Sequence, residues 1–108
     1  VTGTADFIAL PVARLLGVEH VLATELVVAE GRFTGAIVGE PLSGLRKADA
    51  VTDFAQRHGV DLQRSYAYGD STADADMLAA VGCPVAVNPS RRMTRHAMAR
   101  GWDIRAWR

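Results

Sequence analysis

The chain has a single cysteine, Cys83, among its 108 residues, so no internal disulfide can form. This cysteine usage is typical of proteins in a reducing compartment, and we expect the cytoplasm. Cys83 begins the apolar segment 83–87, which favours a small buried hydrophobic side chain over a nucleophile.

An excess of charge is also lacking, because 12 Lys and Arg balance 12 Asp and Glu. A net charge of zero gives no support for non-specific binding to nucleic acid or to an anionic membrane surface. There is no signal peptide and no apolar run of membrane-spanning length. Only the C-terminal stretch is locally basic, and we expect a solvated helix face there, with a binding patch as the alternative. Its arginines are Arg91, Arg92, Arg95, Arg100, Arg105 and Arg108.

A starting Met is lacking as well, since the chain opens directly on Val1-Thr2-Gly3-Thr4. A Thr-Gly turn with so little before it leads us to expect a piece of a longer protein. With 108 residues the chain forms at most one domain. A hydrophobic share of 49% predicts a packed core rather than disorder.

Hydrophobic periodicity predicts alternating helices and strands. Helices are expected at 5–16, 45–58, 72–81 and 90–100. Strands are expected at 20–24, 64–68, 83–87 and 102–104, with a hairpin over 25–38. The alternation in the second half predicts an α/β fold with a largely parallel sheet.

Glycine and proline mark the expected helix ends. Pro11 lies inside the first helical pattern and should kink or split that helix. Thr4 or Asp6 could cap the first helix and Ser90 the last. Four glycines are expected to stop the helices, namely Gly17, Gly59, Gly82 and Gly101.

Two carboxylates follow the apolar strand at 64–68. Asp70 stands where the strand should end, and Asp74 follows near the start of a helix. Mg²⁺ prefers oxygen ligands and keeps several waters, so one or two carboxylates with a substrate phosphate suffice to hold it. Alternatively, Asp70 only caps the following helix, and Asp74 occupies its first turn, where the helix dipole favours anions.

Two further features could bind phosphate. Thr2 and Gly3 precede a helix, where a hydroxyl and backbone N–H groups suit a phosphate oxygen, although the same residues are ordinary turn chemistry. Lys47 lies near the start of the second helix, where an ammonium could neutralise phosphate charge. The alternatives are a solvated Lys47, or its neighbour Arg46 in the same role.

The segment Tyr68-Gly69-Asp70-Ser71-Thr72-Ala73-Asp74, followed by Val87-Asn88-Pro89, resembles the fourth motif and next strand of haloacid dehalogenase superfamily phosphatases. The similarity is to the branch that includes phosphoserine phosphatase. Thr2-Gly3 resembles the second motif of that family and Lys47 the third, in the same order along the chain. The resemblance covers nearly the whole chain.

The resemblance implies Mg²⁺-dependent hydrolysis of a small phosphorylated metabolite through an aspartyl-phosphate. It implies that Asp70 is a metal ligand and that Lys47 stabilises phosphate and nucleophile. Thr2 and the Gly3 amide would hold a phosphate oxygen. Asp74 would support the site, either by orienting metal-bound water or by pairing with Lys47.

The chain departs from the family pattern in three respects. The family's first motif, an Asp-x-Asp that carries the nucleophile, is absent upstream of Thr2, and Asp74-Ala75-Asp76 has its spacing only in a helical context. The substrate-enclosing cap is absent too. Ala73 stands where phosphoserine phosphatases usually have Asn, which puts phosphoserine in doubt.

These departures set the fold that we expect. It is a Rossmann-like three-layer sandwich that lacks its first, central strand and its cap and carries a β-hairpin. The chain would then be the C-terminal part of one core domain, inactive alone. The alternative function is a non-catalytic module that binds phosphate and metal for regulation. The sequence specifies neither the substrate nor the oligomeric state.

Overall fold

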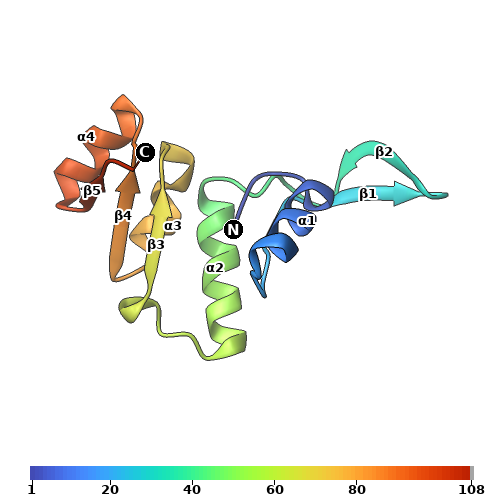
Figure 1. Ribbon diagram of the computed structural model, residues 1–108, viewed down its shortest axis with the longest axis horizontal. Coiled ribbons are helices and arrows are strands. Elements are labelled where there is room, and N and C mark those ends of the chain that lie inside the picture. The colour runs from blue at the N-terminus through green and yellow to red at the C-terminus, as the bar shows by residue number, and fades with distance from the viewer. Residues whose placement is uncertain (108) are drawn as a thin grey trace.

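The computed structural model describes residues 1–107 as a mixed α/β fold with two separate small sheets. The elements in the first half are α1 (Asp6–Leu16), β1 (Leu26–Ala29), β2 (Arg32–Ile37) and α2 (Leu45–His58). Those in the second half are β3 (Tyr66–Gly69), α3 (Ala75–Ala79), β4 (Cys83–Val87), α4 (Arg91–Arg100) and β5 (Asp103–Arg105). Figure 1 shows α2 between the β3–β4–β5 end of the molecule and the end that carries α1 and the hairpin.

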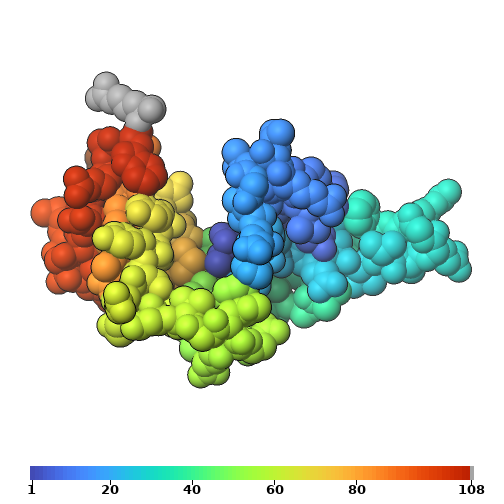
Figure 2. Space-filling model, turned by 60° about the horizontal axis from the view of Figure 1, so that its bottom comes forward, coloured from blue at the N-terminus to red at the C-terminus, as the bar shows by residue number. Residues whose placement is uncertain are grey.

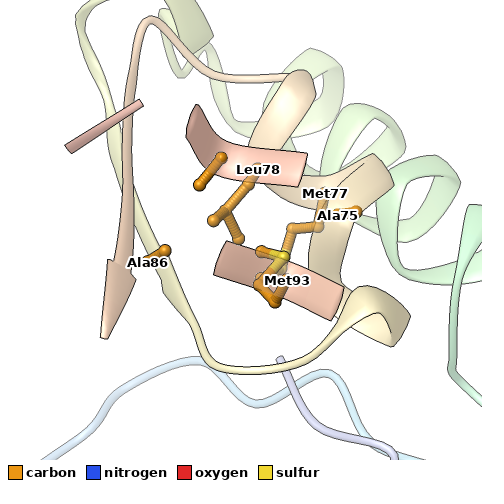
Figure 3. Close-up of a cluster of buried hydrophobic side chains, with 6 residues drawn as sticks. Ala75, Met77, Leu78, Ala86 and Met93 are labelled. Atoms are coloured by element: carbon orange, nitrogen blue, oxygen red, sulfur yellow. The ribbon is translucent and has the colours of Figure 1, made fainter. Parts of the chain in front are cut away.

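The second half forms a parallel three-stranded sheet in the order β3–β4–β5. Each strand is followed by a helical crossover or preceded by one, as the alternating pattern predicts. Ala86 on β4 is fully buried beneath Leu78 of α3 and Met93 of α4, which pack on the same face of the sheet (Figure 3). This cluster is the core, and it fixes the ends of β3 and β4.

The hairpin pairs β1 with β2 in antiparallel fashion. Glu30 and Gly31 form its two-residue turn, and both have positive φ, at 53° and 75°. A turn of this kind matches the right-handed twist of paired strands, which explains the tight connection. The hairpin extends away from the rest of the molecule (Figure 1).

Several sequence predictions agree with the structure. Helix α2 and strand β4 have the predicted bounds. Gly17, Gly59 and Gly101 adopt the left-handed conformation and cap α1, α2 and α4. Ser90 caps α4, because its side chain accepts a hydrogen bond from the Met93 N–H.

Other predictions were wrong. The segment 20–24 is not a strand. Its backbone bonds to the segment 2–6, and within the described residues this pairing amounts to one isolated parallel bridge between Thr24 and Ala5. Helix α1 runs unbroken through Pro11, and its N-cap is Ala5 without a side-chain capping bond.

The expected helix over 72–81 was wrong in extent. It is a 3₁₀ turn (Thr72–Asp74) followed by the five-residue α3, whose C-cap is Ala80. Gly82 is therefore not a helix stop. A Cβ on Gly82 would lie 1.7 Å from the Gln63 carbonyl oxygen, so the close approach of two backbone segments requires glycine there.

Candidate active site

The carboxyl end of β3 brings together three of the predicted site residues. Asp70 follows β3, Asp74 ends the 3₁₀ turn, and Lys47 lies in the first turn of α2. All three line one cavity of about 370 Å³, together with residues of β3, β4 and the C-terminal segment. A cavity at the carboxyl ends of parallel strands is the usual place for a ligand in such sheets.

Lys47 and Asp74 form an ion pair inside this site. Lys47 Nζ lies 2.5 Å from Asp74 Oδ1, and the two side chains are only 12% and 10% exposed. Asp74 Oδ2 accepts a hydrogen bond from the Asp70 N–H at 3.3 Å. Each oxygen of Asp74 thus accepts one hydrogen bond. The family resemblance implies that Asp74 either orients metal-bound water or pairs with Lys47, and the structure contains the pairing with Lys47.

Backbone contacts hold the two halves of this ion pair in place. The Gly44 N–H, at the N-cap of α2, donates to the Ala73 carbonyl at 2.9 Å, which ties α2 to the turn that carries Asp74. Gly69 lies directly against Asp74, because a Cβ at Gly69 would approach Asp74 Cβ to 2.6 Å. The Gly before Asp70 is therefore a packing requirement of the buried Asp74.

Asp70 differs from Asp74 in its surroundings. The residue is exposed, and within residues 1–107 its carboxylate makes no hydrogen bond or ion pair. It does not cap the following turn, whose N-cap is Ser71 without a side-chain bond. The Asp70 carbonyl accepts from the Ser90 N–H at 2.9 Å, so the backbone of Asp70 is fixed while its carboxylate is available.

Thr2 and Gly3 lie on a neighbouring part of the molecule. Thr2 lines a second cavity, of about 420 Å³, beside α1, and Val1 lines both cavities. Thr2 Oγ1 accepts from the Thr4 N–H at 3.1 Å, and the Gly3 carbonyl accepts from Thr24 Oγ1 at 2.8 Å. In the described part of the chain the Gly3 N–H donates no hydrogen bond. Within residues 1–107 no hydrogen bond or ion pair joins this pair to Lys47, and the cavity that Thr2 lines shares Val1 with the Lys47 cavity.

Sequence reasoning missed three residues that line the cavity, namely Tyr68, Asn88 and Trp107. Asn88 had a signal in the Val-Asn-Pro that ends β4, and its φ of 44° marks a special backbone position. Trp107 had none, because it comes to the site only through tertiary structure.

The cavity offers few oxygen ligands for a cation such as Mg²⁺. Among residues 1–107 no group of three or more His, Cys, Asp and Glu side chains could hold a metal. Asp70 supplies one available carboxylate at the cavity, and Mg²⁺ accepts such a site when waters and a phosphate complete its shell. The residues present thus fit Mg²⁺ bound together with a phosphate.

The sequence of residues 1–79 matches the family model of the haloacid dehalogenase-like hydrolases, and the chain belongs to this family. It is 44% identical over all of its 108 residues to phosphoserine phosphatase SerB1 of Mycobacterium tuberculosis H37Rv, of which it covers 35%.

Solved structures agree on the fold. A protein of unknown function from Bordetella pertussis Tohama I superposes with a TM-score of 0.81 and 38% identity, over 93% of this chain and 46% of that one. A substrate-bound phosphoserine phosphatase gives a TM-score of 0.77 and 25% identity, over 98% of this chain and 48% of that one. The Rossmann-like α/β fold class expected from the sequence is therefore confirmed, and the chain spans less than half the length of these relatives. No helix within residues 1–107 is both long and apolar enough to cross a bilayer.

Proposed function

We propose that these residues are the C-terminal part of a single core domain in a longer phosphatase, which hydrolyses a small phosphate monoester. The observation that carries the proposal is the buried Lys47–Asp74 ion pair beside the available carboxylate of Asp70, in one cavity at the carboxyl end of β3. A fixed cation next to an acid that has no partner among residues 1–107 suits a phosphate held with a metal ion.

Each residue has a role in this proposal. Lys47, fixed by Asp74, neutralises the charge of the phosphate and of the group that attacks it. The Thr2 hydroxyl and the Gly3 N–H hold another phosphate oxygen. Asp74 keeps Lys47 oriented, because its carboxylate accepts hydrogen bonds from Lys47 Nζ and from the Asp70 N–H.

Asp70 would hold Mg²⁺ in this proposal. When bound, the metal would offset the negative charge that builds up on the phosphate oxygens. The chain's own part is to present the Asp70 carboxylate from a backbone fixed by the Ser90 N–H.

The nucleophile of the proposed reaction lies outside these 108 residues. Hydrolysis through an aspartyl-phosphate needs an Asp-x-Asp motif, and none precedes Thr2 in this sequence. We place that motif on a strand in the longer protein, so these residues alone would not turn over substrate.

A groove beside β3 supports the position that we propose for the strand with the Asp-x-Asp motif. In residues 1–107, β3 pairs with β4 on one edge only. An apolar groove of about 390 Å³ is lined by residues of β3, among them Ala67, and by Val1, Leu22 and Phe54 from the first half of the chain. Figure 2 shows this hollow between the blue N-terminal segment and the yellow-to-red part of the molecule. An apolar strand in the groove would complete the sheet and deliver an acidic group beside Asp70.

The substrate class stays broad. The relative from Mycobacterium tuberculosis is named a phosphoserine phosphatase. Ala73 departs from the Asn typical of that activity, so we propose a small phosphorylated metabolite without restricting it to phosphoserine. The single cysteine supports a reducing, cytoplasmic location.

The experiment is an NMR titration of the ¹⁵N-labelled 108-residue chain with inorganic phosphate, with and without Mg²⁺. We expect Mg²⁺-dependent shifts at the amides of Gly3, Lys47 and Asp70. Asp70→Asn should remove the Mg²⁺ dependence, and the control Asp76→Asn, an exposed acid two positions beyond Asp74, should retain it. Shifts that ignore Mg²⁺ and Asp70 would contradict the proposal. Binding by the chain together with an inactive longer protein would instead support the non-catalytic regulatory module.

A further inference from the structure

Two aromatic side chains form one wall of the candidate site. The ring centroids of Tyr68, on β3, and Trp107 lie 5.4 Å apart with the planes inclined by 37°. Both residues line the cavity that also contains Lys47 and Asp70. They are 50% and 54% exposed, so part of each side chain is accessible to a ligand, and the Tyr68 ring also stacks on that of Tyr66 at 6.3 Å. We call this pair the aromatic wall.

Asn88 holds Trp107 in this position by two hydrogen bonds. Asn88 Nδ2 donates to the Trp107 carbonyl at 2.7 Å, and the Trp107 N–H donates to Asn88 Oδ1 at 2.8 Å. The amide side chain therefore pairs with the Trp107 backbone as a neighbouring strand would. The Asn88 N–H donates to the Arg105 carbonyl at 2.8 Å, which fixes the same segment one step earlier.

The two Asn88 side-chain bonds lie beyond the last paired residue of β5. Strand β5 already pairs with β4 as far as Arg105. The Asn88 bonds act beyond the end of that pairing and determine where Trp107 lies, against Tyr68 and beside the phosphate-binding groups. Ordering an exposed aromatic ring costs conformational entropy, and a ring ordered in a cavity is prepared to bind.

We propose that Tyr68 and Trp107 determine specificity by receiving an aromatic ring of the phosphate monoester, and that Asn88 is the positioning residue for Trp107. The proposal rests on the proposed function, because the phosphate itself must bind at Lys47 and Asp70. An aromatic group suits the wall, since offset or tilted rings at 4.5–7 Å attract one another beyond simple burial.

The test compares phenyl phosphate with methyl phosphate, which carry the same charged group. Both are titrated into the ¹⁵N-labelled 108-residue chain with Mg²⁺, and two dissociation constants are obtained by NMR. We expect phenyl phosphate to bind about fivefold more tightly, from ring stacking. The indole N–H of Trp107 should shift with phenyl phosphate, while that of Trp102, which packs against the core, should not.

Variants then separate the wall from the fold. Trp107→Ala should bring the ratio of the two constants close to one. Phe33→Ala is the control, because Phe33 is about as exposed as Trp107, pairs with Phe7 and does not line this cavity, and it should keep the ratio.

Asn88 is tested by a pair of substitutions. Asn88→Gly tolerates the positive φ and removes both side-chain bonds, so it should lower the ratio as Trp107→Ala does. Asn88→Asp keeps the acceptor for the Trp107 N–H and should restore part of the ratio. If Asn88 has a purely structural role, its substitution should weaken the binding of phenyl phosphate and methyl phosphate equally and leave the ratio of their dissociation constants unchanged.

The outcomes distinguish this inference from the proposed function. If methyl phosphate binds but the ratio is near one, or is insensitive to Trp107→Ala, the inference is overturned and the proposed function stands. The same ratio near one is expected if the aromatic wall serves only to contact another segment of a longer chain. If methyl phosphate does not bind, the proposed function fails and the inference fails with it.

Discussion

Lys47 and Asp74 lie 27 residues apart in sequence, yet Lys47 Nζ and Asp74 Oδ1 are 2.5 Å apart and largely shielded from water. Removing two charges from water is costly, and the Asp70 N–H offsets part of this cost by donating to the second oxygen of Asp74. The contact joins α2 to the turn after β3, so it is both a structural link and the centre of the proposed site.

Loss of one partner of this ion pair should destabilise the fold. Lys47→Met leaves a buried carboxylate without its cation, and we expect a loss of about 3 kcal/mol in the free energy of unfolding. Urea unfolding followed by circular dichroism measures it. Arg46→Met is the control, since the Arg46–Glu40 pair is 56% and 64% exposed and should contribute less than about 1 kcal/mol. Equal losses in the two variants would contradict the account.

Gly69→Ala should disturb the site through packing. The new Cβ would lie 2.6 Å from Asp74 Cβ, and we expect a cost of about 2 kcal/mol with a displaced Asp74. The amide resonance of Asp70, which donates to Asp74, should shift in the same variant. Gly101→Ala meets no atom within 4 Å and suffers only from its φ of +67°, so it should cost about 1 kcal/mol and leave the Asp70 resonance in place.

Asp70→Asn should leave stability almost unchanged. The carboxylate is exposed and makes no bond in the described residues, so the unfolding free energy should change by less than about 0.5 kcal/mol. Thermal unfolding in the presence and absence of Mg²⁺ checks this. The metal should stabilise the original chain with phosphate present and fail to stabilise the variant. A large loss of stability without metal would show that Asp70 is structural.

The sequence predicts α4 and β4 well because these two elements have strong local signals. Helix α4 has a Ser cap and a Gly stop, and β4 is a short apolar run before Asn-Pro. The prediction of a strand at 20–24 fails for a physical reason. An apolar run becomes a strand only when partners pair with it, and within residues 1–107 the backbone of this segment bonds only with residues near the N-terminus.

The site was predictable only in part, again for physical reasons. Asp70 and Asp74 follow an apolar strand with glycine before them, which is a local pattern. Lys47 has no local signal and was identified by the family resemblance, and the structure places it on Asp74. Trp107 could not be found at all, since its place depends on the side chain of Asn88 far away in sequence.

The measurement that tests the central claim most directly is the hydrolysis of an aryl phosphate with Mg²⁺ by the 108-residue chain and by a longer protein that contains it. We predict no turnover by the chain, and turnover by the longer protein that Lys47→Met abolishes while Arg46→Met retains it. Turnover by the chain alone would contradict the account, as would full activity of the longer protein without Lys47.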